Sequence, residues 1–173
     1  GVETAARLLG VENVYIGVED NKPKAIERLR AVIGNKNIKV VSLKSRYPQG
    51  AEKMLIYALT GRKVSAGKLP ADVGVVVMNV NSASFLAQYL KTGMPLIKKR
   101  ITVDGSAVAK PANVEVLIGT QLKDVFEFCG GFKEEPRKVL MGGPMMGIAQ
   151  FSLETSVVKH TNALLAFNEK DGV

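Results

Sequence analysis

The sequence predicts an α/β protein in two parts, a parallel sheet flanked by helices and then a small α+β module. Across residues 1–93, short apolar segments alternate with helical patterns that end at glycine, which is typical of parallel βαβ units. After Met94-Pro95 the pattern changes to paired β-like segments around Asp104-Gly105, a dipeptide that favours a hairpin turn. We therefore expect one domain over residues 1–94 and a second over residues 95–150.

Helices in the first part are predicted from apolar residues at helical spacing followed by a glycine. Asp20 and Asn21 offer N-caps for the second of them, which carries Pro23 in its first turn. The apolar run at residues 73–78 favours a strand buried on both faces. The other expected elements are strands over residues 14–18 and 38–43 and helices over residues 2–9, 50–59 and 82–91.

The second part is expected to contain three strands and one short helix. Strands are predicted over residues 96–103, 114–118 and 138–141, and a helix over residues 122–128 that ends at Gly130-Gly131. A hairpin, a helix and a strand within so short a segment indicate a small α+β module.

Composition excludes several classes of function. The 173 residues include one cysteine, Cys129, and one histidine, His160, too few for a disulfide framework or for a zinc or iron–sulfur site held by this chain alone. Nothing pairs the two as a nucleophile and base, so Cys129 is predicted to be a buried small apolar residue. No apolar run reaches the roughly 18 residues that cross a bilayer, and no signal-peptide pattern is present, so we expect no direct membrane span.

The net charge of +8 is unevenly distributed along the chain. Residues 1–93 carry 14 basic and 7 acidic side chains, whereas residues 94–173 carry 10 and 9. A basic first part fits an anionic partner such as a dinucleotide, an acidic protein or nucleic acid, although a well-solvated surface is the commoner explanation. Aromatic residues make up only 6% and are not interleaved with basic ones, so we expect no nucleic-acid partner.

Parallel α/β sheets bind ligands beyond the carboxyl ends of their strands, here residues 19–21, 44–49 and 79–82. The strongest candidate is the strand-to-helix junction at residues 46–53, RYPQGAEK, where free N–H groups and the helix dipole favour an anion. Tyr47 offers a ring for stacking, Gly50 permits close approach to the backbone, and Glu52 can accept hydrogen bonds from ribose or nicotinamide. The alternative is that Glu52 only offsets the dipole and Gly50 only makes the turn.

Three further segments are weaker candidates for a ligand site. Residues 79–82, NVNS, would suit a ring edge or a phosphate, but helix capping by Asn81 or Ser82 is the commoner use. The segment GGPMMG at residues 142–147 is predicted to be a tight turn whose methionines pack on the core. The basic run Lys98-Lys99-Arg100 is predicted to be a solvated strand edge rather than a phosphate site.

Five motifs are distinctive: GVEDNKP (residues 17–23), YPQGAEKMLIYALTG (47–61), LPADVG (69–74), KVLMGGPMMG (138–147) and VVKHTN (157–162). They closely resemble the NADH-oxidising flavoprotein subunit of the Rnf electron transport complex, a ferredoxin:NAD oxidoreductase. The motifs are long, occur in order and extend over nearly the whole chain. The same region is similar, more distantly, to the flavoprotein subunit of respiratory complex I.

The resemblance implies a Rossmann-like domain that holds FMN and receives hydride from NADH, followed by a β-grasp module of the soluble-ligand-binding (SLBB) type. By position in the motifs, it implies that Tyr47, Gly50 and Glu52 line the flavin and NADH site and that Asn79 lies near the flavin phosphate. Complex I has an acidic residue where this chain has Ala51, and an asparagine where it has Met78, so these two contacts differ.

The resemblance also implies that the chain is the middle of a longer protein. A glycine-rich flavin loop would precede Gly1, and residues 151–173 would be a linker to a domain holding two 4Fe-4S clusters. The implied partners are NADH, other subunits of a membrane electron-transport complex and, indirectly, ferredoxin, at the cytoplasmic face of the bacterial inner membrane. Two alternatives stay open: a related cobalamin reductase of bacterial microcompartments, and a non-catalytic ligand-binding or docking module.

Overall fold

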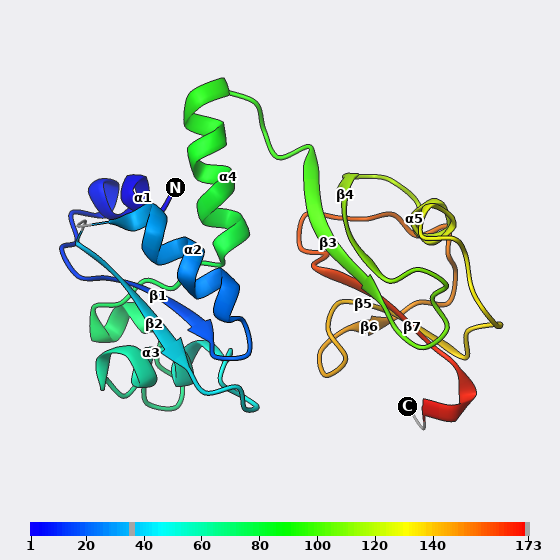
Figure 1. The fold of residues 1–173 in the computed structure, drawn as a ribbon, viewed down its shortest axis with the longest axis horizontal. Helices are drawn as coiled ribbons and strands as arrows, with labels where there is room; N and C mark the ends of the chain where they lie inside the picture. Colours follow the sequence, from blue (N-terminus) through cyan, green and yellow to red (C-terminus); the bar gives the residue numbers. More distant parts are fainter. Residues whose placement is uncertain (35–36, 172–173) are drawn as a thin grey trace. The chain divides into compact units, whose positions relative to one another are not determined.

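The computed structural model describes residues 1–34 and 37–171 (Figure 1). The chain divides into two compact units, Gly1–Leu90 (unit 1) and Lys91–Val173 (unit 2). The boundary expected near residue 94 lies in the segment just after this division. Each unit is described separately below.

Unit 1 is built on a parallel pair of strands, β1 (Val14–Glu19) and β2 (Ile38–Leu43), in register from Val14 opposite Ile38 to Glu19 opposite Leu43. The helix α2 (Pro23–Ile33) connects them and completes a βαβ unit. The other elements are α1 (Val2–Leu9), α3 (Glu52–Thr60), the 3₁₀ helix η1 (Pro70–Val73) and α4 (Val80–Thr92).

Helices α2 and α3 cover opposite faces of this pair of strands (Figure 1). A β-carbon on Gly17 would lie 2.9 Å from Leu43 Cδ1 and 3.0 Å from Leu55 Cδ1, so α3 packs closely on the Gly17 face. Side chains alternate between faces along a strand, so Ser42 belongs to the other face. There Ser42 and Ile26 of α2 line a hollow. Helices on both faces of a parallel sheet are the predicted α/β class.

The strand predicted over residues 73–78 is wrong. Val73 ends η1, Gly74 has a positive φ of 66°, and the described residues 75–79 form no strand. Val76 and Met78 are 61% and 42% exposed. The apolar run supplies side chains for a buried strand, but a strand also needs a neighbouring backbone to pair with. In the described part of the chain, β1 and β2 pair only with each other.

Unit 2 contains a five-stranded mixed sheet and the helix α5 (Leu122–Phe128), which has the predicted bounds. The strand order is β4-β3-β7-β5-β6, with β3 parallel to β7 and the other neighbours antiparallel. A mixed sheet with one packed helix is the expected α+β module. The strands are β3 (Lys98–Asp104), β4 (Ala112–Leu117), β5 (Lys138–Met141), β6 (Ile148–Ala149) and β7 (Ala163–Phe167), and a short 3₁₀ helix η2 (Glu169–Asp171) follows.

The prediction that residues 151–173 are a linker is wrong, because they contain the central strand of this sheet. β7 pairs with β3 on one side and β5 on the other, and Leu164, Leu165 and Ala166 are buried. Without β7 the sheet would separate into two hairpins. The α+β module therefore extends beyond residue 150.

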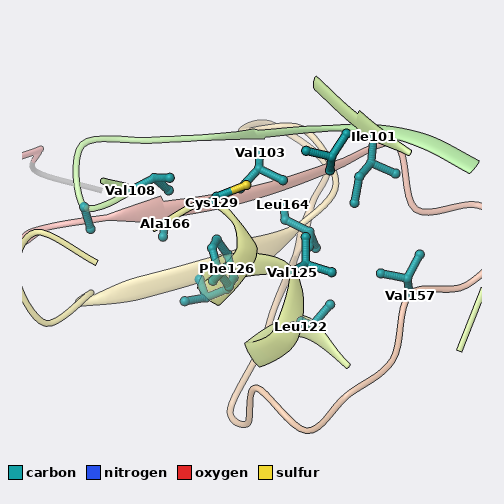
Figure 2. Close-up of a cluster of buried hydrophobic side chains, with 13 residues drawn as sticks. Ile101, Val103, Val108, Leu122, Val125, Phe126, Cys129, Val157, Leu164 and Ala166 are labelled. Atoms are coloured by element: carbon teal, nitrogen blue, oxygen red, sulfur yellow. The ribbon is translucent and has the colours of Figure 1, made fainter. Parts of the chain in front are cut away.

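The core of unit 2 lies between the sheet and α5. Figure 2 shows Leu122, Val125 and Phe126 of the helix in one buried cluster with Val103 and Leu164 of the strands. Cys129 is 3% exposed and belongs to the same cluster, and burial raises the pKa of its thiol. The prediction of a buried small apolar residue is confirmed.

The methionines of the GGPMMG segment do not pack on the core as predicted. Met145 and Met146 are 70% and 91% exposed. The turn itself is tight, since Gly147 N donates to Gly143 O at 2.7 Å and a β-carbon on Gly142 would lie 2.9 Å from Gly147 Cα. Glycine lets the two arms of the turn touch, and this closure directs the side chains at its tip outward.

The basic run does not lie at a sheet edge, because β3 is an interior strand. Lys98 and Arg100 project from one face, 3.8 Å and 3.6 Å from carboxylate oxygens of Glu115 on β4. Lys99 points to the other face, its Nζ donates to the carbonyl of Lys159, and burial lowers its pKa. All three cations therefore have partners within unit 2.

Candidate functional site

The strand-to-helix junction predicted as a ligand site lies between the end of β2 at Leu43 and the start of α3 at Glu52. It brings Tyr47, Gly50 and Glu52 together within one exposed segment. The Tyr47 ring is 78% exposed, so it is open to a stacking partner. The junction, residues 44–52, is therefore a largely exposed segment at the carboxyl end of a parallel strand, where α/β sheets place ligands. We call this segment the ledge.

A buried glutamine holds the ledge in shape. Gln49 is only 5% exposed although its neighbours face solvent. Its N–H donates to Arg46 O at 2.8 Å, and Arg46 Nε donates to its side-chain Oε1 at 3.4 Å. Ala51 N donates to Pro48 O at 2.8 Å, and the Tyr47–Pro48 peptide bond is cis. Tyr47 thus lies at the outer side of a compact, internally hydrogen-bonded turn.

Helix α3 begins at this ledge without a capping side chain. Its N-cap is Ala51, which makes no side-chain cap hydrogen bond, and Glu52 lies in the first turn. A β-carbon on Gly50 would meet no atom within 4 Å, so the backbone there is open to close approach. Uncapped N–H groups attract an acceptor, while Glu52 already offsets part of the dipole.

Asn79 is placed by a different helix and acts as its cap. Asn81 N donates to Asn79 Oδ1 at 2.9 Å, and Ala83 N donates to Asn79 O at 3.0 Å. The capping role was expected for Asn81 or Ser82, and Asn79 performs it instead. Within the described part of the chain, no hydrogen bond joins Asn79 to the ledge. The structure therefore groups three of the four predicted residues in one segment and places Asn79 at the start of another helix.

Sequence reasoning missed a link between the ends of β1 and β2. Asp20 was expected to cap α2, but the N-cap of α2 is Lys22, and it has no side-chain cap. Asp20 Oδ1 instead accepts a hydrogen bond from Ser45 N at 3.0 Å. Hydrogen bonds from the Ser45 side chain and backbone hold the pKa of Asp20 below its ordinary value. The available signal was the parallel order itself, which places residues after β1 beside residues after β2.

The ledge offers three exposed features that a planar ring could contact. Tyr47 offers an exposed ring face, Gly50 an open backbone and Glu52 an exposed carboxylate. In the described residues, no buried side-chain polar atom lacks a hydrogen-bond partner. Nor do they include a group of three His, Cys, Asp or Glu able to hold a metal ion, or a helix long and apolar enough to cross a membrane.

Comparison with protein families gives two matches. Residues 1–88 match the family described as the Nuo51 FMN-binding domain, and residues 100–149 match the SLBB domain. The first match contains the whole ledge and Asn79. The second begins within β3 and ends at β6.

Three relatives are similar over almost the whole chain. A subunit of the proton-translocating ferredoxin:NAD(+) oxidoreductase complex of Clostridium ljungdahlii is 47% identical over 99% of this chain. Its counterpart in the Na(+)-translocating complex of Acetobacterium woodii is 48% identical over 98%, and that in the ion-translocating oxidoreductase complex of Rhodobacter capsulatus is 42% identical over 96%. The chain spans only 37%, 39% and 32% of the lengths of these relatives, respectively.

A solved structure shares the fold. An NAD+-reducing [NiFe]-hydrogenase in the H2-reduced state superimposes with a TM-score of 0.77 at 18% sequence identity. The match covers 98% of this chain and 35% of the hydrogenase chain. The family resemblance carried by the five sequence motifs is confirmed by these comparisons.

Proposed function

Because the chain belongs to the family of the Nuo51 FMN-binding domain, we propose that it is the nucleotide-binding and β-grasp part of the flavoprotein subunit of an ion-translocating ferredoxin:NAD oxidoreductase complex. The observation that carries the proposal is the exposed ledge at the carboxyl end of β2, inside the matched region. FMN, when bound, accepts a hydride from NADH and releases electrons singly to iron–sulfur centres. The chain contributes binding and orientation.

Each ledge residue has a role that its surroundings support. Tyr47 stacks on a ring of the bound nucleotide with its exposed face. Gly50 allows the backbone to approach that ring, since no side chain fills the space beside it. Glu52 accepts hydrogen bonds from the ribose or nicotinamide of NADH. Asn79, at the start of α4, contributes to the flavin phosphate region in the same proposal.

The proposal includes the setting of the whole protein. Unit 1 is the FMN and NADH domain, and the SLBB domain comprises unit 2 with β7 included. Two 4Fe-4S clusters belong to other parts of the protein, because unit 2 contributes a single buried cysteine. Other subunits of the complex are its partners, with ferredoxin reached indirectly, at the cytoplasmic face of the membrane. The names of the relatives favour this function over a cobalamin reductase or a non-catalytic docking module.

The test replaces Glu52 by glutamine in the full-length, flavin-loaded protein. Glu52→Gln converts one charge-assisted hydrogen bond, worth roughly 1.5–3 kcal/mol, into a neutral one worth about half as much, so kcat/KM for NADH should fall about 3- to 10-fold. Flavin content should stay normal, because Glu52 orients NADH and does not hold FMN. The matched control is Glu12→Gln, which removes an exposed carboxylate before β1. An unchanged kcat/KM in Glu52→Gln would refute the proposed role.

A further inference from the structure

The ends of β1 and β2 are joined by a set of hydrogen bonds that the proposed nucleotide chemistry does not use. Asp20 N donates to Leu43 O at 2.7 Å, and Ser45 N donates to Asp20 Oδ1 at 3.0 Å. Asn21 N donates to Ser45 Oγ at 3.4 Å. The bonded residues are more than twenty positions apart in sequence, so the set fixes the turn after β1 to the start of the ledge.

The Asp20–Ser45 contact is charge-assisted. The Ser45 side chain and backbone both bond to the carboxylate and lower its pKa, so Asp20 is ionised at neutral pH. Both residues are exposed, so packing does not fix their positions and these hydrogen bonds do. The neighbouring carboxylate behaves differently: Glu19 pairs with Lys22 of its own turn at 2.8 Å.

The contact lies at one end of the segment that presents Tyr47. Ser45 is held by Asp20, and four residues later Gln49 is buried and bonded to Arg46. Tyr47 therefore lies between two residues that are held by hydrogen bonds, Ser45 and Gln49. Glu52, three residues after Gln49, is the first residue of α3. Loss of the Asp20–Ser45 hydrogen bond would let the start of the ledge move, while Gln49 would still hold its second half.

We propose that Asp20 is the positioning residue of the ledge, holding Ser45 so that Tyr47 and Glu52 meet the nicotinamide nucleotide in a fixed arrangement. The inference rests on the proposed function for the identity of the ligand. Asp20 itself need not touch the nucleotide. Its effect passes through the backbone of Ser45 and the turn that follows.

The test uses the full-length, flavin-loaded protein with Asp20→Ala, Asp20→Asn, Ser45→Ala and the control Glu19→Gln. In Asp20→Ala, amide hydrogen exchange in residues 43–51 should accelerate about 10-fold, because one charge-assisted hydrogen bond is lost. For the same reason KM for NADH should rise about 10-fold, while kcat should stay within twofold of the unmodified protein. Asp20→Asn keeps an acceptor oxygen and should recover most of the KM. Asp20→Ala and Ser45→Ala should be non-additive. Glu19→Gln should match the unmodified protein.

Two results would overturn the inference. One is unchanged exchange in residues 43–51 of Asp20→Ala, and the other is faster exchange with an unchanged KM. If Asp20→Ala fails to fold, Ser45→Ala, which removes the Ser45 hydroxyl from the same set of hydrogen bonds, gives the same two readouts. Failure of the proposed function gives a different pattern, because KM and kcat/KM for NADH would then also be unaffected by Tyr47→Ala and Glu52→Gln.

Discussion

Replacing Phe126 by alanine should destabilise unit 2 strongly, whereas the same change at Phe128 should have little effect. The two side chains belong to the same short helix, α5, yet Phe126 is 1% exposed and Phe128 is 81% exposed. The Phe126 ring lies in the core (Figure 2), and its centroid is 4.8 Å from that of Phe132. Comparing Phe126→Ala with Phe128→Ala therefore isolates the effect of burial, because the two positions lie in the same helix and the substitution is the same.

The expected magnitude follows from this burial. Truncating a fully buried phenylalanine to alanine costs about 3–5 kcal/mol, and small domains are stable by about 5–15 kcal/mol in total. For a domain of this size, each kcal/mol shifts the melting temperature by about 4–8 °C, so Phe126→Ala should lower Tm by about 12–40 °C. An exposed substitution stays within about 0.5 kcal/mol, so Phe128→Ala should shift Tm by only a few degrees.

The assay must report on unit 2 specifically. All four tyrosines lie in unit 1 and the chain has no tryptophan, so intrinsic fluorescence does not follow the α5 core. Calorimetry, together with labelling of the single thiol at Cys129, does follow it, because Cys129 is buried beside Phe126. Equal Tm shifts for Phe126→Ala and Phe128→Ala would refute the packing described for α5.

Two further predictions concern the same sheet and core. Gly105→Ala should destabilise unit 2 by at least about 2 kcal/mol more than Gly131→Ala in urea unfolding. Both glycines have a positive φ, but only a β-carbon on Gly105 would meet another backbone, Ala166 O at 2.2 Å. Similar losses of stability in the two variants would count against the close approach of residue 105 to β7. Cys129, whose buried thiol has a raised pKa and stays protonated at pH 7, should react with a maleimide at least about 100-fold more slowly than a free cysteine, and fast labelling of the native protein would contradict its burial.

Local patterns predicted much of both units. Helix α5 has its predicted bounds, and β2 does too, because apolar spacing and terminal glycines are recorded in short stretches of sequence. The ledge was found by the same means, since Tyr47, Gly50 and Glu52 are sequence neighbours between a strand and a helix. These features need no knowledge of the rest of the fold.

The failures involve contacts between distant parts of the chain. Residues 73–78 have the composition of a buried strand but no backbone partner in the described part of unit 1. Residues 163–167 received no strand prediction, although the run ALLAF is the central strand β7 once β3 and β5 are available to pair with it. The Asp20–Ser45 bond likewise depends on which strand lies beside β1. In each case the outcome depends on which strands pair with each other, and strand pairing cannot be read from a single sequence.

The two units bury very different amounts of apolar surface, and this decides where each experiment belongs. In the described residues, four buried apolar side chains lie in unit 1 and fifteen in unit 2, although the units are similar in length. Unit 2 thus has a core that can be measured in the 173-residue chain. In unit 1, Tyr47, Val76 and Met78 are among the exposed apolar residues, and apolar surface adds about 25 cal/mol per Å² when it is covered. A nucleotide stacked on Tyr47, as in the proposed function, would cover part of this surface, so the roles proposed for Glu52 and Asp20 are measured in the full-length protein.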